Sequence, residues 1–350
     1  MLVAVYVAWL GVDQASVEGS FRVAEALADR GELLHTPAGI GFPLLISSIV
    51  SLGGYELTEV TLAVLAAGGF VLGALLARRI VPEPYASAGA ALAGLSAPAV
   101  AYAGVVGPEM TAGVLLAGAT LLTVSAREDT RPASVFGAAA MLAVLPWLDP
   151  RYLLPALPIA FALYEWCRRG RRPTMGLIAV ELVAASVVTY VTVNERVFGG
   201  PTPWSTYPSG VSATGAFSVV DHVERVPRLV TLWLDPGAGL LRWAPVFALV
   251  FFAAWLLRRS RIEGLARVVP ERATAEAAAG LALAVIACVL LVAAFLTPTI
   301  DTQPFAARNL VPALPVAVAP IAWGLRHAPR VGAALGAVTL VISGWVLVSA

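Results

Sequence analysis

The stretch TEVTLAVLAAGGFVLGALLARR, residues 58–79, is a long apolar run that ends in a pair of arginines. Its apolar residues are continuous rather than alternating with polar ones, which favours a helix over a strand. At a rise of about 1.5 Å per residue, about 20 such residues cross the roughly 30 Å hydrocarbon core of a bilayer. The pattern therefore predicts a membrane-spanning helix with a positively charged end.

The composition of the whole chain follows the same pattern. Of its 350 residues, 59% are hydrophobic and 13% are charged, with a mean hydropathy of +0.83. Soluble domains carry roughly 25% charged residues. A backbone in lipid must satisfy its own hydrogen bonds, so spanning segments are helices or closed barrels, and long runs select helices. We expect one all-α transmembrane domain over residues 1–350, a polytopic bundle in the lipid bilayer.

Charge and cysteine content exclude two other classes of protein. The net charge of +1 gives no electrostatic footprint for nucleic acid, and all 23 basic residues are arginine. The two cysteines, Cys167 and Cys288, lie at or within apolar runs and lack metal-ligand spacing, so neither a disulfide framework nor a metal site is predicted from them.

Eleven apolar runs are expected to span the membrane. They cover residues 1–11, 58–77, 84–106, 110–126, 133–148, 152–167, 175–193, 239–257, 276–297, 309–325 and 331–349.

Arginine clusters predict the orientation, because positively charged loops stay in the cytoplasm. Five clusters follow or separate the runs: 78–79, 127–131, 168–172, 258–261 and 326–330. With all five in the cytoplasm, the eleven spans alternate without conflict. The loops 12–57, 107–109, 149–151, 194–238 and 298–308 then lie outside, on the extracytoplasmic face of the plasma membrane.

Two further helices are expected in the first outer loop. Residues 38–53 are apolar, but counting them as a span would put Arg78 and Arg79 outside, so we interpret them as a helix at the outer surface. Residues 16–30 form an amphipathic neighbour, with Phe21 and Ala24 on its apolar side.

Ionisable residues collect at the outer helix ends. Charged groups near the bilayer core are costly, so each is a candidate site. Each also has a structural reading: Asp13 can cap a helix, Glu109 can be a polar loop tip, Asp149 and Arg151 can form a clamp with each other, and Arg308 can reach lipid headgroups. Glu181 lies well inside a span, and we expect it to face the bundle.

The order of these features resembles the GT-C superfamily of polyprenyl-phosphate-sugar-dependent glycosyltransferases, which includes the protein mannosyltransferases and the aminoarabinose transferase of lipid A. The similarity runs nearly end to end but consists of weak motifs. In chain order they are VEGSFRVAEALADRGEL (17–33), GFPLLISSIVSLGG (41–54), RRIVPEPYASAGAALAGLSAPAVAYAGVVGPEM (78–110), LPWLDPRYLLPALP (145–158), NERVFGGPTPW (194–204), LDPGAGLLRWAPVF (234–247) and FAARNLVPALPV (305–316).

The first loop departs from the family pattern. Members usually carry an Asp-Glu doublet there, whereas this chain has Asp13 followed by Gln14, and Glu18 five residues further on. Asp13 is close to the first span, which favours it as the counterpart of the family's acidic doublet. Alignment from Gly31 favours Glu18 as part of that doublet instead.

The resemblance implies transfer of a sugar from a polyprenyl phosphate to an extracytoplasmic lipid, glycan or protein acceptor, with inversion. Asp13 would be the general base, with Glu18 second, and Glu109 the other acidic member, holding the acceptor or a divalent cation. Arginine suits the leaving lipid phosphate because its planar fork matches phosphate oxygens. The substrate-binding residues would be Arg151, Arg308, Asp149, Tyr152, Trp204 and Arg242.

Two other functions stay open. The broken doublet favours a non-catalytic membrane protein that binds a lipid-linked sugar. A transporter or flippase would show inverted repeats and charges at mid-membrane, and the sequence offers only Glu181 there.

Overall fold

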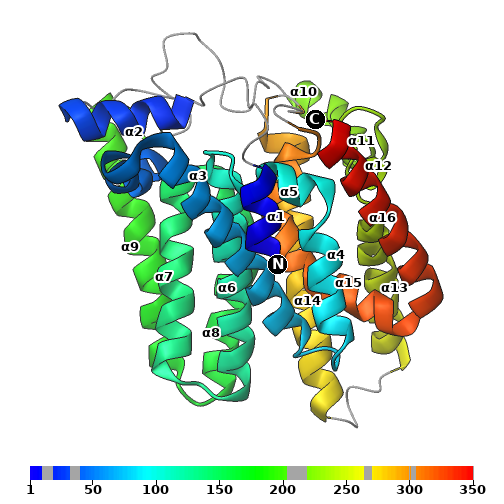
Figure 1. Cartoon of the computed structure of the whole chain (residues 1–350). Helices are drawn as coiled ribbons and strands as arrows, with labels where there is room; N and C mark the ends of the chain where they lie inside the picture. Colours follow the sequence, from blue (N-terminus) through cyan, green and yellow to red (C-terminus); the bar gives the residue numbers. More distant parts are fainter. Residues whose placement is uncertain are drawn as a thin grey trace.

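A computed structural model covers the chain and describes residues 1–9, 19–31, 40–202, 219–263, 270–298, 300 and 305–349. All regular elements in these ranges are helices, which confirms the predicted all-α class (Figure 1). The α-helices are α1 Leu2–Trp9, α2 Gly19–Arg30, α3 Gly41–Ala77, α4 Tyr85–Gly94, α5 Ala97–Ala103, α6 Pro108–Glu128, α7 Pro132–Leu148, α8 Leu153–Arg169, α9 Pro173–Phe198, α10 Val219–Glu224, α11 Arg228–Leu234, α12 Leu240–Trp243, α13 Ala248–Glu263, α14 Pro270–Leu291, α15 Leu314–His327 and α16 Pro329–Ser349. Short helical turns add η1 Pro150–Tyr152, η3 Pro245–Phe247, η5 Val292–Leu296 and η6 Arg308–Ala313.

Six helices in the described part of the chain are long and apolar enough to cross a membrane. They are Gly41–Ala77, Pro108–Glu128, Pro173–Phe198, Arg272–Leu296, Arg308–His327 and Pro329–Ser349. A seventh is counted if α4 and α5, which are bent by 65° at a short break, form one broken span. The other predicted spans coincide with shorter helices, for example the 8 residues of α1 and the 17 of α8. The count of eleven therefore stays a prediction.

Helix α15 forms the centre of the bundle. All of its residues from Leu314 to Leu325 are buried, and it contacts α3, α4, α6, α13, α14 and α16. Close packing against α3 depends on Gly73, because a Cβ there would lie 2.3 Å from the carbonyl oxygen of Pro315. Small residues at such crossings let membrane helices approach closely enough to gain van der Waals contact.

Helix α3 contains the separation predicted between a surface helix and a span. Gly53 (φ −159°, ψ 20°) and Gly54 (φ 62°, ψ −150°) leave the helical conformation and divide the helix. Gly54 adopts a positive φ that glycine reaches without steric cost. The two parts are thus joined directly by a kink rather than by a loop, and the second part begins near Tyr55 instead of at 58.

The amphipathic helix predicted at 16–30 is α2, which lies across one end of the bundle beside the first part of α3 (Figure 1). Phe21 and Ala24 are buried as expected, and the Phe21 ring packs edge-on against Tyr55 with centroids 5.0 Å apart. Arg22 and Glu25 are exposed. The helix is held by its apolar side.

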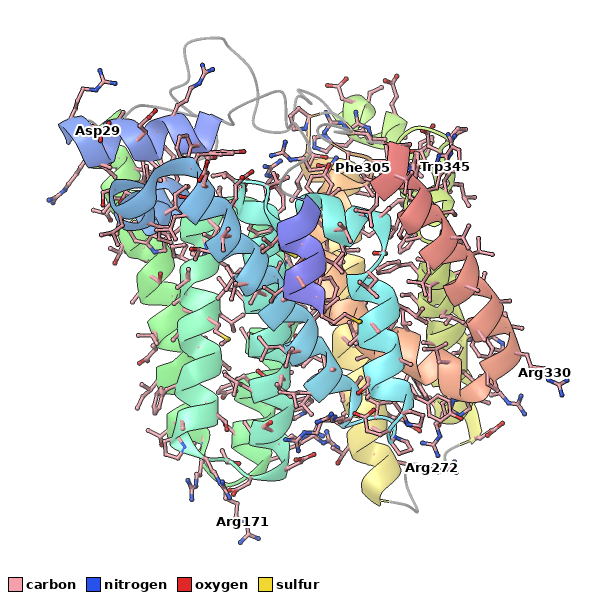
Figure 2. All side chains as sticks on the ribbon, viewed as in Figure 1. Asp29, Arg171, Arg272, Phe305, Arg330 and Trp345 are labelled. Atoms are coloured by element: carbon pink, nitrogen blue, oxygen red, sulfur yellow. The ribbon has the colours of Figure 1, made fainter. Side chains whose placement is uncertain are left out.

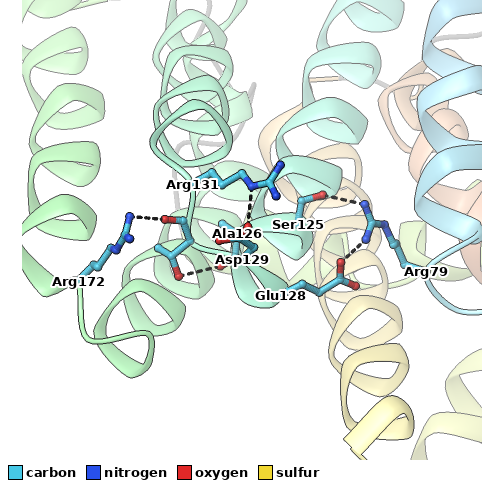
Figure 3. Close-up of polar contacts among 8 residues, drawn as sticks. Arg79, Ser125, Ala126, Glu128, Asp129, Arg131 and Arg172 are labelled. Atoms are coloured by element: carbon cyan, nitrogen blue, oxygen red, sulfur yellow. Dashed lines mark hydrogen bonds and ion pairs between the residues drawn. The ribbon is translucent and has the colours of Figure 1, made fainter.

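The first three arginine clusters meet at the opposite end. Arg79 forms an ion pair with Glu128 of α6, and the Arg172 Nη1 donates to the carbonyl oxygen of Thr130 at 2.8 Å (Figure 3). These contacts join the ends of α3, α6 and α8.

The remaining two clusters lie at the same end, since Arg259 and Arg326 line one cavity with Ile80. Figure 2 shows Arg171 and Arg330 toward this end, with Asp29 at the other. The described arginine clusters therefore mark a single face of the bundle.

The expectation that Glu181 faces the bundle is wrong. Its side chain is exposed on α9, and only 17% of the most apolar stretch of that helix is buried. Helix α9 packs mainly against α7 and α8 at the edge of the bundle, so most of its circumference points outward.

Candidate functional site

An ion pair joins two outer helix ends. Glu109 lies in the first turn of α6, where the partial positive charge of the helix N-terminus favours a carboxylate. Its Oε1 accepts a hydrogen bond from Nε of Arg308, the first residue of η6, at 2.8 Å. The two side chains are 18% and 19% exposed. The pair therefore connects two segments that are distant in sequence in a mostly water-free setting.

A second pair closes the turn between α7 and α8. Asp149 directly follows α7. Its Oδ1 accepts a hydrogen bond of 2.8 Å from the backbone N–H of Arg151, and this bond caps the start of η1. The Arg151 Nε and Nη2 also donate to the Asp149 carboxylate, at 2.9 and 2.5 Å. Burial lowers the pKa of Arg151, but the charge of Asp149 more than offsets this and holds the pKa above its usual value. Asp149, only 3% exposed, fixes the direction of the guanidinium.

One member of each pair, Glu109 and Arg151, lines a common cavity of about 30 Å³. Its polar wall includes Glu109, Arg151, Tyr152 and Asn309, and its other lining residues are Pro155, Val289, Val292, Thr297 and Pro312. A single buried water needs about 10–15 Å³ of such space, so the cavity accommodates one or two waters. A sugar would enter only if the walls separate.

Two arginines at the junction of α10 and α11, Arg225 and Arg228, complete this end of the bundle. Arg225 Nη1 donates to the carbonyl oxygens of Phe295 and Thr297, at 2.9 and 3.2 Å. Arg228 donates to the carbonyl oxygens of Thr297 and Pro298, at 3.0 and 3.1 Å. These carbonyls end the π-helical turn η5, where helix dipoles favour cations. The two side chains thus dock α10 and α11 onto the wall of the cavity.

Arg225 and Arg228 are not among the site residues predicted from the sequence. Their spacing of three residues in VERVPRL, just before an apolar segment, was the available signal, because it places both side chains on one side of a helical turn. Arg225 is 5% exposed. Burial, and then the nearby charge of Arg225, lower the pKa of Arg228.

Guanidinium groups collect around the cavity within the described residues. Four guanidinium groups gather there, from Arg151, Arg225, Arg228 and Arg308. The carboxylates of Glu109 and Asp149 pair with Arg308 and Arg151, and α10 carries Asp221 and Glu224 just before Arg225. Several guanidinium groups close together suit an anionic ligand, because arginine presents planar donors that match phosphate oxygens.

The structure places the predicted site residues in three groups. Glu109, Asp149, Arg151, Tyr152 and Arg308 are brought together at the cavity. Asp13, Glu18 and Trp204 lie outside the described ranges. Arg242 is described but lies away from the cavity lining.

Arg242 does not line the cavity. Its side chain is exposed, donates to the carbonyl oxygen of Pro236 and lies over the ring of Trp243, 5.1 Å from the centroid. Neither contact involves the two ion pairs, so a substrate-binding role beside Glu109 does not follow from its position.

The described residues offer no group of three or more His, Cys, Asp or Glu side chains that could hold a metal ion. Glu109 and Asp149 are each ion-paired with an arginine. The divalent cation that the resemblance implies, with Glu109 as the residue that would hold it, stays a prediction.

The chain matched no protein-family model, no curated protein and no solved structure. Its function is therefore inferred from the chemistry of the site.

Proposed function

We propose that this chain is a membrane glycosyltransferase with a GT-C-like fold, which moves a sugar from a polyprenyl-phosphate donor to an extracytoplasmic acceptor. The supporting observation is the gathering of the Glu109–Arg308 and Asp149–Arg151 pairs around one cavity, at the end opposite the arginine clusters. By the positive-inside rule, the clustered end is cytoplasmic, and the cavity then lies at the extracytoplasmic leaflet.

The arginines stabilise the negative charge of the leaving group. When the bond between the anomeric carbon and the phosphate oxygen breaks, the lipid phosphate leaves with the electron pair and gains negative charge. Arg151 lines the cavity, where Asp149 holds it in a fixed direction, and Arg308 is bonded to Glu109 of the same wall. Preorganised cations stabilise developing charge without having to reorient during the reaction.

The carboxylates deprotonate and position the acceptor. Its hydroxyl oxygen forms the new bond to the anomeric carbon from the opposite face, which inverts the configuration, and a carboxylate takes the hydroxyl proton. The resemblance assigns the proton to Asp13, with Glu18 as the second choice. Glu109 is the remaining acidic group, and its pairing with Arg308 suits it to position the acceptor. The prenyl chain would lie along the apolar helices beside the first part of α3.

A second candidate is favoured by the same geometry. Glu109 and Asp149 already pair with arginines, and the cavity admits only one or two waters. Such a closed arrangement also fits a non-catalytic membrane protein that binds a lipid-linked sugar. The transporter alternative has no such support, since Glu181 is exposed.

Transfer from defined donors tests the proposal. The chain in lipid nanodiscs would be given radiolabelled polyprenyl-phosphate hexoses and pentoses with a membrane extract as the source of acceptor. We expect label transfer and release of polyprenyl phosphate, with loss of turnover in Asp13→Asn or Glu18→Gln and in Glu109→Gln. Glu25→Gln, an exposed carboxylate on α2, is the matched control.

The two candidate functions differ in outcome. Retained donor binding, with no turnover by the parent chain and no effect of the three variants, would support the non-catalytic protein. Absence of both binding and turnover across the donors would contradict both.

A further inference from the structure

A second and larger cavity lies at the opposite end of the bundle, among α13, α14 and α15. Its volume is about 320 Å³. Its charged lining includes Arg259 and Glu263 of α13, Arg272 and Glu276 of α14, and Arg326 of α15. It is ten times larger than the cavity beside Glu109 and shares no lining residue with it. It is therefore a separate site that the proposed transfer reaction does not use.

Part of its charge is already paired. Arg259 Nε donates to Glu263 Oε1 at 2.8 Å, one helical turn further along α13. Ser260 donates to Glu276 and so joins α13 to α14. On the side of α13, the polar groups of the cavity wall are therefore already hydrogen-bonded to one another.

The other side carries unpaired cations. Arg272 and Arg326 line the cavity from two different helices, and neither forms an ion pair or a side-chain hydrogen bond with any residue in the described ranges. His327 contacts the Trp323 carbonyl oxygen through Nδ1 at 3.0 Å, so its Nε2 is on the other edge of the ring. Two guanidinium groups on one cavity present several N–H donors to a single anion.

The remaining wall is apolar. Leu256, Trp323 and Ile80 line the cavity beside the charged residues. A site with cations at one side and apolar surface at the other matches a molecule that has both an anionic group and a hydrocarbon part. Basic pockets between membrane helices on the arginine-rich face bind the headgroups of anionic lipids in this way.

We propose that this cavity binds a phosphate ester, with the phosphate between Arg272 and Arg326. An anionic phospholipid is the source that the apolar wall favours, because its glycerol and acyl region would lie against Leu256 and Trp323. A free phosphate compound shares the same recognition chemistry but makes no use of that wall.

Lipid-dependent stabilisation of the full chain tests the site. The purified protein in neutral detergent would receive phosphatidylglycerol, phosphatidylcholine or inorganic phosphate, each in its own arm. The readouts are the melting temperature and the number of lipids retained in native mass spectrometry. We expect phosphatidylglycerol to raise the melting temperature and to be retained, and phosphatidylcholine to do neither.

Variants locate the effect. Arg272→Gln/Arg326→Gln should lose most of the shift caused by phosphatidylglycerol, and the single Arg326→Gln variant should lose part of it. The matched control is Arg171→Gln/Arg330→Gln, which removes the same charge at the same end but away from the cavity (Figure 2). It should retain the shift.

The arms separate the sources of phosphate. If only inorganic phosphate raises the melting temperature, and Arg272 and Arg326 are required, the cavity is a phosphate site. Its ligand is then a free phosphate compound and not a phospholipid. Equal shifts in both double variants, or no shift from either probe, would overturn the proposal. Neither result bears on sugar transfer at the other end.

Discussion

Glu109 and Arg308 are 199 residues apart in the sequence, yet their side chains form a hydrogen-bonded ion pair of 2.8 Å that joins α6 to η6. The pair is about four-fifths shielded from solvent. It connects the second acidic turn of the sequence to its last outer loop.

The first prediction concerns this pair. Glu109→Gln and Arg308→Gln should each destabilise the protein by about 1–3 kcal/mol, because each leaves a mostly buried charge without its partner. The double variant should cost less than the sum of the two, since it removes both charges. Thermal unfolding of the four proteins in detergent measures this, and strictly additive losses would mean that the two groups do not interact.

Asp149 and Asp129 give a matched comparison of burial. Each pairs with the arginine two residues later, but the Asp149–Arg151 side chains are 3% and 27% exposed and the Asp129–Arg131 side chains 60% and 75%. Asp149→Asn should cost about 1.5–3 kcal/mol, since hydrogen bonds to charged groups are lost in a buried turn.

Asp129→Asn should cost at most about 1 kcal/mol, because water screens an exposed pair. Thermal unfolding compares the two variants. In the transfer assay, Asp149→Asn should lower the rate of sugar transfer and Asp129→Asn should leave it unchanged. Equal losses from the two would show that burial does not decide the strength of these pairs.

Helix packing at the centre of the bundle predicts a difference between two glycines of α3. Gly73→Ala would place a methyl group 2.3 Å from the Pro315 carbonyl oxygen, and the forced shift should cost about 1–3 kcal/mol. Gly68 has no atom within 4 Å of the added carbon, so Gly68→Ala should be neutral or stabilise the helix by up to about 1 kcal/mol. Melting temperatures of the two variants check this. A tolerated alanine at 73 would contradict the close crossing of α3 and α15.

Asp235 predicts a pH dependence. Backbone N–H groups of Ala238 and Gly237 donate to its Oδ1, at 2.8 and 2.7 Å, and hold the pKa of the carboxyl below its ordinary value. A pKa that is lower in the folded state stabilises the fold above the unfolded value, about 3.9. This contribution is lost as the pH falls through the folded pKa.

Asp235→Asn keeps an oxygen acceptor but cannot titrate. The parent chain should therefore melt above the variant at neutral pH, and the difference should shrink as the pH falls below the unfolded value and through the folded pKa of Asp235. Melting curves over this pH range provide the measurement. A difference that stays constant with pH would show that the carboxylate charge plays no part in the turn.

Two single cysteines test the orientation. Val220 of α10 and Ile262 near the end of α13 are 64% and 76% exposed, at opposite ends of the bundle. In intact cells, an impermeant thiol reagent should label Val220→Cys and should reach Ile262→Cys only after permeabilisation, because the arginine-rich end is expected inside. The parent chain, with Cys167 and Cys288, reports the background. Labelling of Ile262→Cys alone would invert the topology and remove the cavity from the donor leaflet.

Hydropathy and charge along the chain were sufficient to predict helices at the apolar runs and arginine clusters at one end. These properties are local, because the lipid solvent acts on each segment separately. The gathering of Glu109, Asp149, Arg151 and Arg308 at the other end also followed, since the ends of neighbouring spans meet at one face. Only the tertiary structure shows that Glu109 pairs with Arg308, that Arg225 and Arg228 hold the end of η5, and that Glu181 faces outward. Those outcomes depend on how far each helix is rotated and how closely its small residues let it approach its neighbours. Rotation and approach are determined by packing among residues far apart in the sequence, and no pattern within a single run contains them.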